Sequence, residues 1–283
     1  MNSFFGENVL LSGKSSKKIY ESIKDLPIID YHCHLDQAAI KADKKFTDIG
    51  ELWLAGDHYK WRAMRMCGVD EYYITGNASF HEKFLHYAEI LPQLFGNPLY
   101  YWTHFELKQV FGIDKPLNKD SAEEIYAEAN KKLQELSVQK LLKLFRVQFV
   151  ATTNDPTEDL KDHGKINETD VTPTFRPDKL YNFDSKYIEE LSKVVGYPLN
   201  DLDSFQKALE ERLDFFKSKG CKITDHGFRS FPKAYATYEQ AKSLYLKRDS
   251  LTSEEKDSLF GYLLVFLMKE YKKRGLLMQI HFS

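Results

Sequence analysis

The chain has 283 residues, of which 42% are hydrophobic and 29% are charged. This composition is typical of a globular protein with material for one large domain or two smaller ones. A formal net charge of -2 excludes a broad basic surface for nucleic acid or for anionic lipid.

Cysteine usage and apolar run length indicate the compartment. Cys33, Cys67 and Cys221 are widely scattered, which does not suggest a disulfide framework and fits a reducing cytoplasm. No apolar run approaches the ~20 residues of a membrane span, and the N-terminus lacks the pattern of a signal peptide. We therefore expect a cytoplasmic protein with no membrane partner.

The first predicted strand covers Leu26 to Leu35 and contains His32-Cys33-His34. On a strand, residues i and i+2 point to the same face, so both imidazoles can converge on one metal ion while Cys33 points away. Short His-x-His strings also arise by chance as ordinary polar residues. A strand that ends in paired ligands before a polar loop is nevertheless how (β/α)8 barrels present their chemistry.

The next segment, residues 39–143, is too long for a single crossover between strands. It is rich in aromatic residues and helical in pattern, so we expect a helical insertion that acts as a lid over the rim and supplies substrate contacts. At its C-terminal end, one helix is predicted from Ser121 to Phe145, opening with a capping box formed by Ser121 and Glu124.

Later in the chain, the pattern of an apolar run followed by a polar exit recurs four times. The segments are Val147–Pro156, Val171–Asp178, Gly220–Gly227 and Gly275–Ser283. Between them, helices are predicted for Ser204–Lys219 and for Ser253–Arg274, the latter with Ser253 near its cap and Gly275 just past its end.

Strands that alternate with helices predict a parallel α/β sheet, and polar strand exits favour a barrel. A complete TIM-like (β/α)8 barrel needs eight strands, and about five are visible here. We therefore expect residues 1–283 to form one incomplete barrel domain with the helical insertion after its first strand.

Several motifs in this order resemble the uronate isomerase family, also called glucuronate isomerase, of the amidohydrolase superfamily. The resemblance runs from about Phe5 to the last residue and matches the N-terminal part of the family's longer sequence. The motifs are His32-x-His34 after Pro27-Ile28-Ile29-Asp30, Asp57-His58-Tyr59-x-Trp61, Thr152-Thr153-Asn154-Asp155-Pro156, Phe175-Arg176-Pro177-Asp178, Asp225-His226 and Gln279-Ile280-His281.

The resemblance implies a metal-dependent barrel in which His32 and His34 bind a divalent metal, most simply zinc. It places His281 on the rim near the metal or the substrate. Arg176 is the expected anchor for the substrate carboxylate, because a guanidinium pairs with a carboxylate in a fork that lysine cannot copy. Tyr59 would donate a second hydrogen bond, although Arg176 could instead pair with Asp178 and Tyr59 could be insertion core.

The implied reaction is the aldose to ketose conversion of hexuronates, from D-glucuronate to D-fructuronate and from D-galacturonate to D-tagaturonate. It proceeds by metal-assisted proton transfer through an enediol. Asp225, His58 and Tyr59 are the candidate catalytic residues; His58, Tyr59 and His281 are also candidates for substrate contact. His226 is a weaker candidate because an Asp-His pair also occurs in ordinary turns.

The chain departs from the family pattern in one respect. The family's last-strand aspartate, which completes the metal site, and the arginine two residues later are not found, so we expect a fragment with compromised activity. Two alternatives stay open: a metal-dependent hydrolase of the same superfamily, and a non-catalytic truncated paralogue that acts as a binding subunit. The sequence leaves the preferred uronate, the metal and any homo-oligomer undecided.

Overall fold

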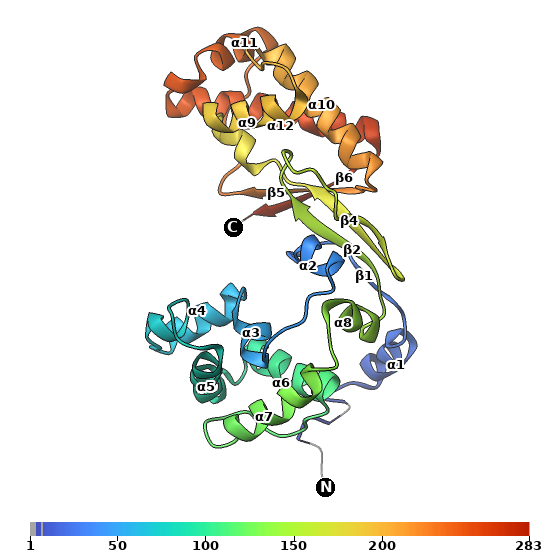
Figure 1. The fold of residues 1–283 in the computed structure, drawn as a ribbon. Coiled ribbons are helices and arrows are strands. Elements are labelled where there is room, and N and C mark those ends of the chain that lie inside the picture. The colour runs from blue at the N-terminus through green and yellow to red at the C-terminus, as the bar shows by residue number, and fades with distance from the viewer. Residues whose placement is uncertain (1–3, 7, 283) are drawn as a thin grey trace. The chain divides into compact units, whose positions relative to one another are not determined.

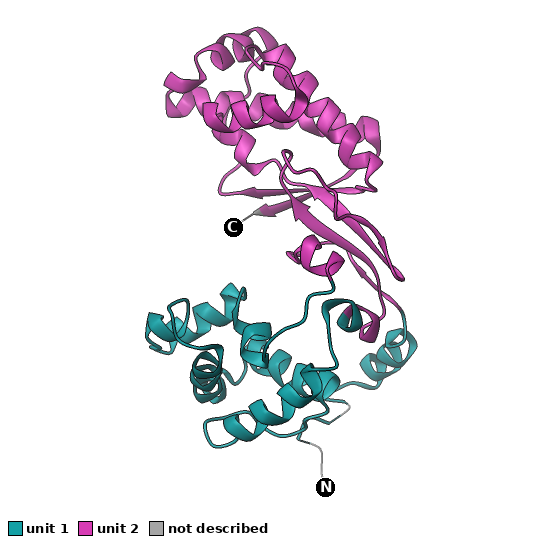
Figure 2. Cartoon of the chain, viewed as in Figure 1, with its two compact units in different colours: residues 1–26, 43–141 teal, residues 27–42, 142–283 magenta. Residues whose placement is uncertain are grey.

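The computed structural model describes residues 4–6 and 8–282, which form two compact units. Unit 1 comprises residues 1–26 and 43–141, and unit 2 comprises residues 27–42 and 142–283 (Figure 2). The chain thus enters unit 2 for its first strand, leaves it for a long helical segment and returns for the rest of the sheet.

All the regular secondary structure among the described residues of unit 1 is helical. Its elements are α1 (Lys14–Ile23), α3 (Ile49–Leu54), α4 (His58–Met66), η1 (Glu71–Tyr73), α5 (Phe80–Ile90), η2 (Leu91–Leu94), α6 (Pro98–Phe111) and α7 (Ala122–Leu133), and α8 (Val138–Leu144) runs across the boundary to unit 2 (Figure 1). Side-chain caps start several of these helices: Asp48 accepts from the Glu51 N–H, and Ser79 forms a capping box with Glu82. Such caps satisfy amide groups that the first turn leaves unpaired.

The core of unit 1 is an aromatic and aliphatic cluster between these helices. Trp53 of α3 stacks on Phe84 of α5 with ring centroids 5.8 Å apart, and Tyr87 is fully buried beside them. The hydroxyl group of Tyr87 hydrogen-bonds Thr103 of α6 at 2.7 Å, so its polar atom is satisfied. The aromatic richness of this segment is therefore used in part for its own core.

Unit 2 contains the sheet. Its elements are β1 (Ile28–Asp30), α2 (Gln37–Lys41), β2 (Val147–Asn154), β3 (Gly164–Ile166), β4 (Thr169–Phe175), η3 (Asp178–Asn182), α9 (Ser185–Val195), α10 (Leu202–Ser218), β5 (Ile223–Phe228), α11 (Tyr238–Leu246), η4 (Arg248–Ser250), α12 (Ser253–Arg274) and β6 (Leu277–Phe282). Strands β1, β2, β4, β5 and β6 pair in that order and all in parallel, while the short β3 pairs antiparallel to β4. This arrangement confirms the predicted incomplete TIM-like barrel of five parallel strands.

Helices cover one side of this sheet. Figure 1 shows α9, α10, α11 and α12 gathered together beside β4, β5 and β6, and their buried side chains form one core with the outward-facing residues of the strands. Phe175 of β4 meets Phe216 of α10 edge to face, with centroids 5.1 Å apart. Crossover helices that pack on a parallel sheet in this way leave the strand ends to carry polar side chains.

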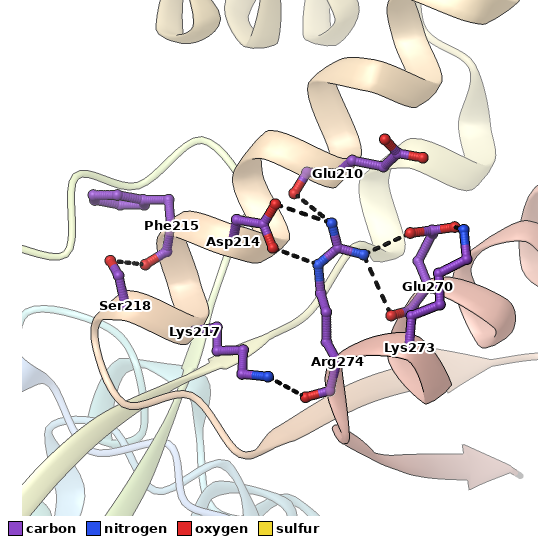
Figure 3. Close-up of polar contacts among 8 residues, drawn as sticks. All are labelled: Glu210, Asp214, Phe215, Lys217, Ser218, Glu270, Lys273 and Arg274. Carbon is purple, nitrogen blue, oxygen red and sulfur yellow. Dashed lines mark hydrogen bonds and ion pairs between the residues drawn. The ribbon is translucent and has the colours of Figure 1, made fainter.

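A charged network fastens the C-terminal ends of α10 and α12 together (Figure 3). Arg274 donates to both carboxylate oxygens of Asp214, at 2.7 and 3.0 Å, and also to Glu270, which is only 3% exposed. Lys217 donates to the carbonyl oxygen of Arg274, and Gly275 ends the helix at a φ of 66°. Since β6 begins two residues later, this network fixes where that strand starts.

Four local predictions need correction. The first strand ends at Asp30 rather than at Leu35, so the histidines lie beyond it. The helix predicted from Ser121 to Phe145 is two helices, α7 and α8, because Ser137 starts a new turn by accepting from the Lys140 N–H. Ser121 forms no capping box; its hydroxyl group donates to the carbonyl oxygen of Pro116 instead.

The fourth correction concerns α12, whose N-cap is Thr252 in a capping box with Glu255, not Ser253. Strand β3 was not predicted, because three residues are too few to show a periodicity. Within the described part of the chain, no helix is both long and apolar enough to cross a membrane.

Candidate functional site

Polar side chains gather at the carboxyl ends of β4, β5 and β6 in unit 2. Asp225 and Gly227 of β5 lie beside Gln279 and His281 of β6 in the parallel register. Because residues i and i+2 of a strand share a face, Asp225 and His281 point to the same side of the sheet. Arg176 follows directly after Phe175, the last residue of β4.

Three side chains in this group have the geometry of a metal site. His32, Asp225 and His281 each offer one ligand atom, and these atoms lie within 4.8 Å of one another. His281 Nε2 is 2.7 Å from Asp225 Oδ1, and His32 Nδ1 is 3.8 Å from Asp225 Oδ2. The rings of His32 and His281 are 4.5 Å apart between centroids.

Asp225 is the centre of this cluster and is 0% exposed. Arg176 Nη1 also lies 3.0 Å from its Oδ2. These distances suit ion pairs, yet among the described residues neither carboxylate oxygen, nor His32 Nδ1, has a partner with hydrogen-bond geometry. A buried carboxylate with no hydrogen bond is costly, and a cation among these ligand atoms would satisfy it. The donor set of two imidazoles and one carboxylate therefore fits a divalent metal.

The histidine environment agrees with a ligand role. Burial lowers the pKa of His32; the nearby Asp225 raises it, and His281, His34 and Arg176 lower it. A depressed pKa keeps the imidazole neutral near pH 7, and only a neutral imidazole has a lone pair for a metal.

The other predicted site residues of unit 2 are placed as follows. His34 is exposed and lies outside the three-residue cluster, although its ring centroid is 5.1 Å from that of His32. Cys33 is partly buried, and burial raises the pKa of its thiol to about 11, as expected for a packing residue. His226 faces the helices, where its Nδ1 meets the hydroxyl group of Tyr181 at 2.8 Å, and burial lowers its pKa to about 3.

His58 and Tyr59 belong to unit 1, at the start of α4. Asp57 caps this helix by accepting from the Tyr59 N–H and the Lys60 N–H, and its side chain also pairs with the Lys60 ammonium group at 2.8 Å. Both rings are exposed, with centroids 4.3 Å apart. Their roles at the site stay predictions.

The loop after β2 makes polar contacts that the sequence did not reveal. Glu158 accepts from the amide group of Asn154, from the Asp155 N–H and from Gln37 of α2. His163 contacts the hydroxyl group of Thr152 at 2.8 Å. The Thr-Thr-Asn-Asp-Pro motif is thus held in a polar network, and no short-range pattern in the sequence signals Glu158 or His163.

A hollow of about 520 Å³ opens between the two edge strands of the sheet. It is lined by Ile28–His32 of the first strand and its exit, and by Gln279–His281 of β6. This volume lies within the range of small-molecule pockets, about 300–1,000 Å³. Two of the three candidate ligands, His32 and His281, line it, so a molecule in the hollow would contact the candidate metal site.

Comparisons with known proteins agree with this picture. The family model described as glucuronate isomerase matches residues 1–283. The chain is similar to the uronate isomerases of Caldicellulosiruptor saccharolyticus, at 41% identity over all of this chain and 64% of the relative, and of Oceanobacillus iheyensis, at 40% identity over all of this chain and 63% of the relative.

Solved structures give the same result. Uronate isomerase from Thermotoga maritima matches with a TM-score of 0.95 and 35% identity over 98% of this chain and 64% of that one. Glucuronate isomerase from Caulobacter crescentus matches in fold with a TM-score of 0.90 at 24% identity, over 99% of this chain and 63% of that one. The chain spans about 64% of the length of the relatives it matches. It belongs to the glucuronate isomerase family.

Proposed function

We propose that this chain contributes the metal site and the carboxylate anchor of a hexuronate isomerase. The observation that carries the proposal is Asp225, a fully buried carboxylate that faces two imidazoles and a guanidinium group at the carboxyl ends of parallel strands. Membership of the glucuronate isomerase family supports the same reaction class.

His32, Asp225 and His281 are the residues we propose to hold the metal, with zinc as the first candidate. Of the two ligands predicted from the sequence, His32 and His34, this assignment retains His32. His34 lies next to the site and is proposed as a further ligand or a substrate contact. It also moves Asp225 from a proposed base to a proposed ligand. When bound there, a divalent cation supplies positive charge that stabilises negative charge on a substrate oxygen.

Arg176 is the proposed anchor for the substrate carboxylate. Its side chain is 26% exposed, so solvent and ligand can reach it, and its guanidinium group lies beside the proposed metal site. An arginine fork fixes both the position and the rotation of a carboxylate. The carboxylate end of a hexuronate would then be held while the aldehyde end is oriented for reaction.

The proposed reaction moves one proton between neighbouring carbons. Removal of the C2 proton and addition of a proton to the aldehyde oxygen give an enediol. Loss of the proton from the C2 hydroxyl and return of a proton to C1 then leave a ketone at C2 and an alcohol at C1. His58 and Tyr59 are the proposed residues for proton relay and for contact with substrate hydroxyls. D-glucuronate would yield D-fructuronate, and D-galacturonate would yield D-tagaturonate.

The two alternatives have less support. A hydrolase of the same superfamily would use the same metal ligands but does not account for Arg176 beside them, and the family model that matches the whole chain is an isomerase. A non-catalytic binding subunit has no specific observation in its favour. The three scattered free cysteines support the proposal that the protein works in the cytoplasm.

The test uses the 283-residue chain with Zn²⁺ and either D-glucuronate or D-galacturonate, alone and with a separately purified polypeptide. That polypeptide corresponds to the roughly 36% of the Thermotoga maritima enzyme that the 64% match leaves uncovered. Nuclear magnetic resonance in D₂O follows ketose formation and deuterium at C1. We expect ketose in the mixture that contains both polypeptides. If the two associate and bind zinc but form no ketose from either uronate, the proposal is wrong.

A further inference from the structure

Arg176 is fastened to a second carboxylate besides Asp225. Its Nε donates to Asp178 Oδ2 at 2.8 Å with good hydrogen-bond geometry, whereas its Nη1 lies 3.0 Å from Asp225 Oδ2 without it. The arginine thus makes a well-directed hydrogen bond to Asp178 and an ion pair without hydrogen-bond geometry to Asp225.

Asp178 is in turn fixed by the backbone of β5. The Gly227 N–H donates to both oxygens of Asp178, at 3.0 and 3.2 Å. Asp178 is also the first residue of η3, so its backbone is part of a short helical turn. A carboxylate that is fixed from two sides can hold the guanidinium group in one orientation.

Gly227 provides the space for that orientation. A Cβ atom at this position would lie 2.7 Å from Arg176 Nη2 and 3.0 Å from Asp178 Oδ2. Gly227 is not among the glycines with positive φ, so an alanine would fit its backbone conformation. Because Gly227 has no side chain, the guanidinium group of Arg176 can lie close to its backbone.

The arrangement matters because an arginine and a cation compete for the same carboxylate oxygens. Asp225 has both oxygens buried and neither accepts a hydrogen bond among the described residues. A guanidinium group without other attachment would close on such a carboxylate as a two-pronged fork. That fork would occupy the lone pairs that a metal needs.

We propose that Asp178, with the space left by Gly227, is a positioning residue that holds Arg176 away from a full fork on Asp225 and so keeps that carboxylate open to a divalent cation. The inference rests on the proposed metal site. It adds a role for two residues outside the cluster of His32, Asp225 and His281.

The first experiment measures Zn²⁺ affinity by competition with a chromophoric chelator. We expect D178N to weaken zinc binding about tenfold, within the 10- to 100-fold range typical of residues that orient metal ligands. R176M should bind zinc at least as tightly as the wild type, and R176M/D178N should match R176M within about threefold. D170N, an exposed carboxylate on β4, is the matched control and should leave the affinity unchanged.

Rescue by the second substitution separates positioning from a structural role. If Asp178 only stabilised the turn of η3, removing Arg176 would not restore zinc binding in the double variant, and the proposal would be overturned. G227A should weaken zinc binding in the Arg176 background and have little effect in R176M, because its added methyl group meets the guanidinium group.

The second experiment needs no metal. In ¹⁵N-arginine-labelled protein, the Arg176 Nε–H signal, identified by its loss in R176M, should exchange slowly with solvent and exchange faster in D178N. Equal exchange in both proteins would overturn the proposal. If wild-type protein binds no zinc, the proposed metal site fails and this inference with it. If it binds zinc and D178N binds equally well, only this inference fails.

Discussion

Replacing Asp225 by asparagine tests two effects of its buried charge separately: its effect on the stability of the metal-free protein and its contribution to zinc binding. The substitution keeps the size of the side chain but removes the charge of a carboxylate that is fully buried and accepts no hydrogen bond among the described residues. Arg176 keeps its bond to Asp178 and remains partly exposed, so no buried cation is left alone. In metal-free protein we therefore expect the free energy of unfolding to change by no more than about 1 kcal/mol.

With zinc present, we expect the wild type to be clearly more stable than D225N. A ligand at 100 times its Kd stabilises the folded state by about 2.7 kcal/mol. Loss of one of three protein ligands should weaken binding by at least about 100-fold, as even residues that only orient ligands cost 10- to 100-fold. At the same zinc concentration D225N would then gain only about 0.4 kcal/mol.

The assay has to report unit 2. All three tryptophans, Trp53, Trp61 and Trp102, lie in unit 1, so their fluorescence would follow the wrong unit. Hydrogen exchange with mass spectrometry on a peptide covering β5 reports on the stability of unit 2. Zinc should slow its exchange about 100-fold in the wild type and about twofold in D225N.

Two results would refute this reasoning. A loss of about 3 kcal/mol or more in metal-free D225N would mean that Asp225 is mainly the structural partner of Arg176. Full protection by zinc in D225N would mean that the carboxylate is not a ligand. The exposed D170N is the control and should stay within about 0.5 kcal/mol of the wild type with and without zinc.

Further predictions concern the helices that position β6. R274A should lower the free energy of unfolding by about 2–3 kcal/mol in urea titrations followed by circular dichroism, since Glu270 is buried but keeps Lys273 as a partner; no measurable loss would show that the network is incidental. Burial raises the pKa of Glu270, but the opposing effect of Lys273 and Arg274 is larger, so the pKa lies below its ordinary value. The stabilisation from Glu270 is therefore present above about pH 4.3 and lost as the pH falls through the lower folded-state value; acid unfolding of E270Q should depend less on pH in that window, and an unchanged slope would contradict the assignment. G261A should cost about 1–3 kcal/mol, because its Cβ would lie 2.2 Å from the carbonyl oxygen of Ala234; a thermal melt identical to that of the wild type would argue against this close approach.

The sheet was predictable because its signals are local. Each long strand is an apolar run followed by a polar exit, and each of the five predicted segments overlaps a parallel strand. The break between α7 and α8 was missed because the helical pattern continues across it, although Ser137 is a typical N-cap residue. Strand β3 was missed because it depends on pairing with β4 rather than on its own sequence.

The residues of the candidate site could be named individually from the sequence, but their grouping could not be predicted. His32, Arg176, Asp225 and His281 were all identified, yet the alternation argument that paired His32 with His34 assumes a strand. The strand ends at Asp30, and beyond it the chain no longer alternates faces regularly. That Asp225 lies between His32 and His281 depends on contacts across about 190 and about 56 residues, which a single sequence does not reveal.

The proposed metal site can be tested by a crystal structure of the chain soaked in Zn²⁺, with anomalous data collected at the zinc edge. We expect an anomalous peak about 2.0–2.2 Å from one atom each of His32, Asp225 and His281, and no such peak in D225N. A zinc ion bound elsewhere, or a site that keeps its zinc in D225N, would contradict it.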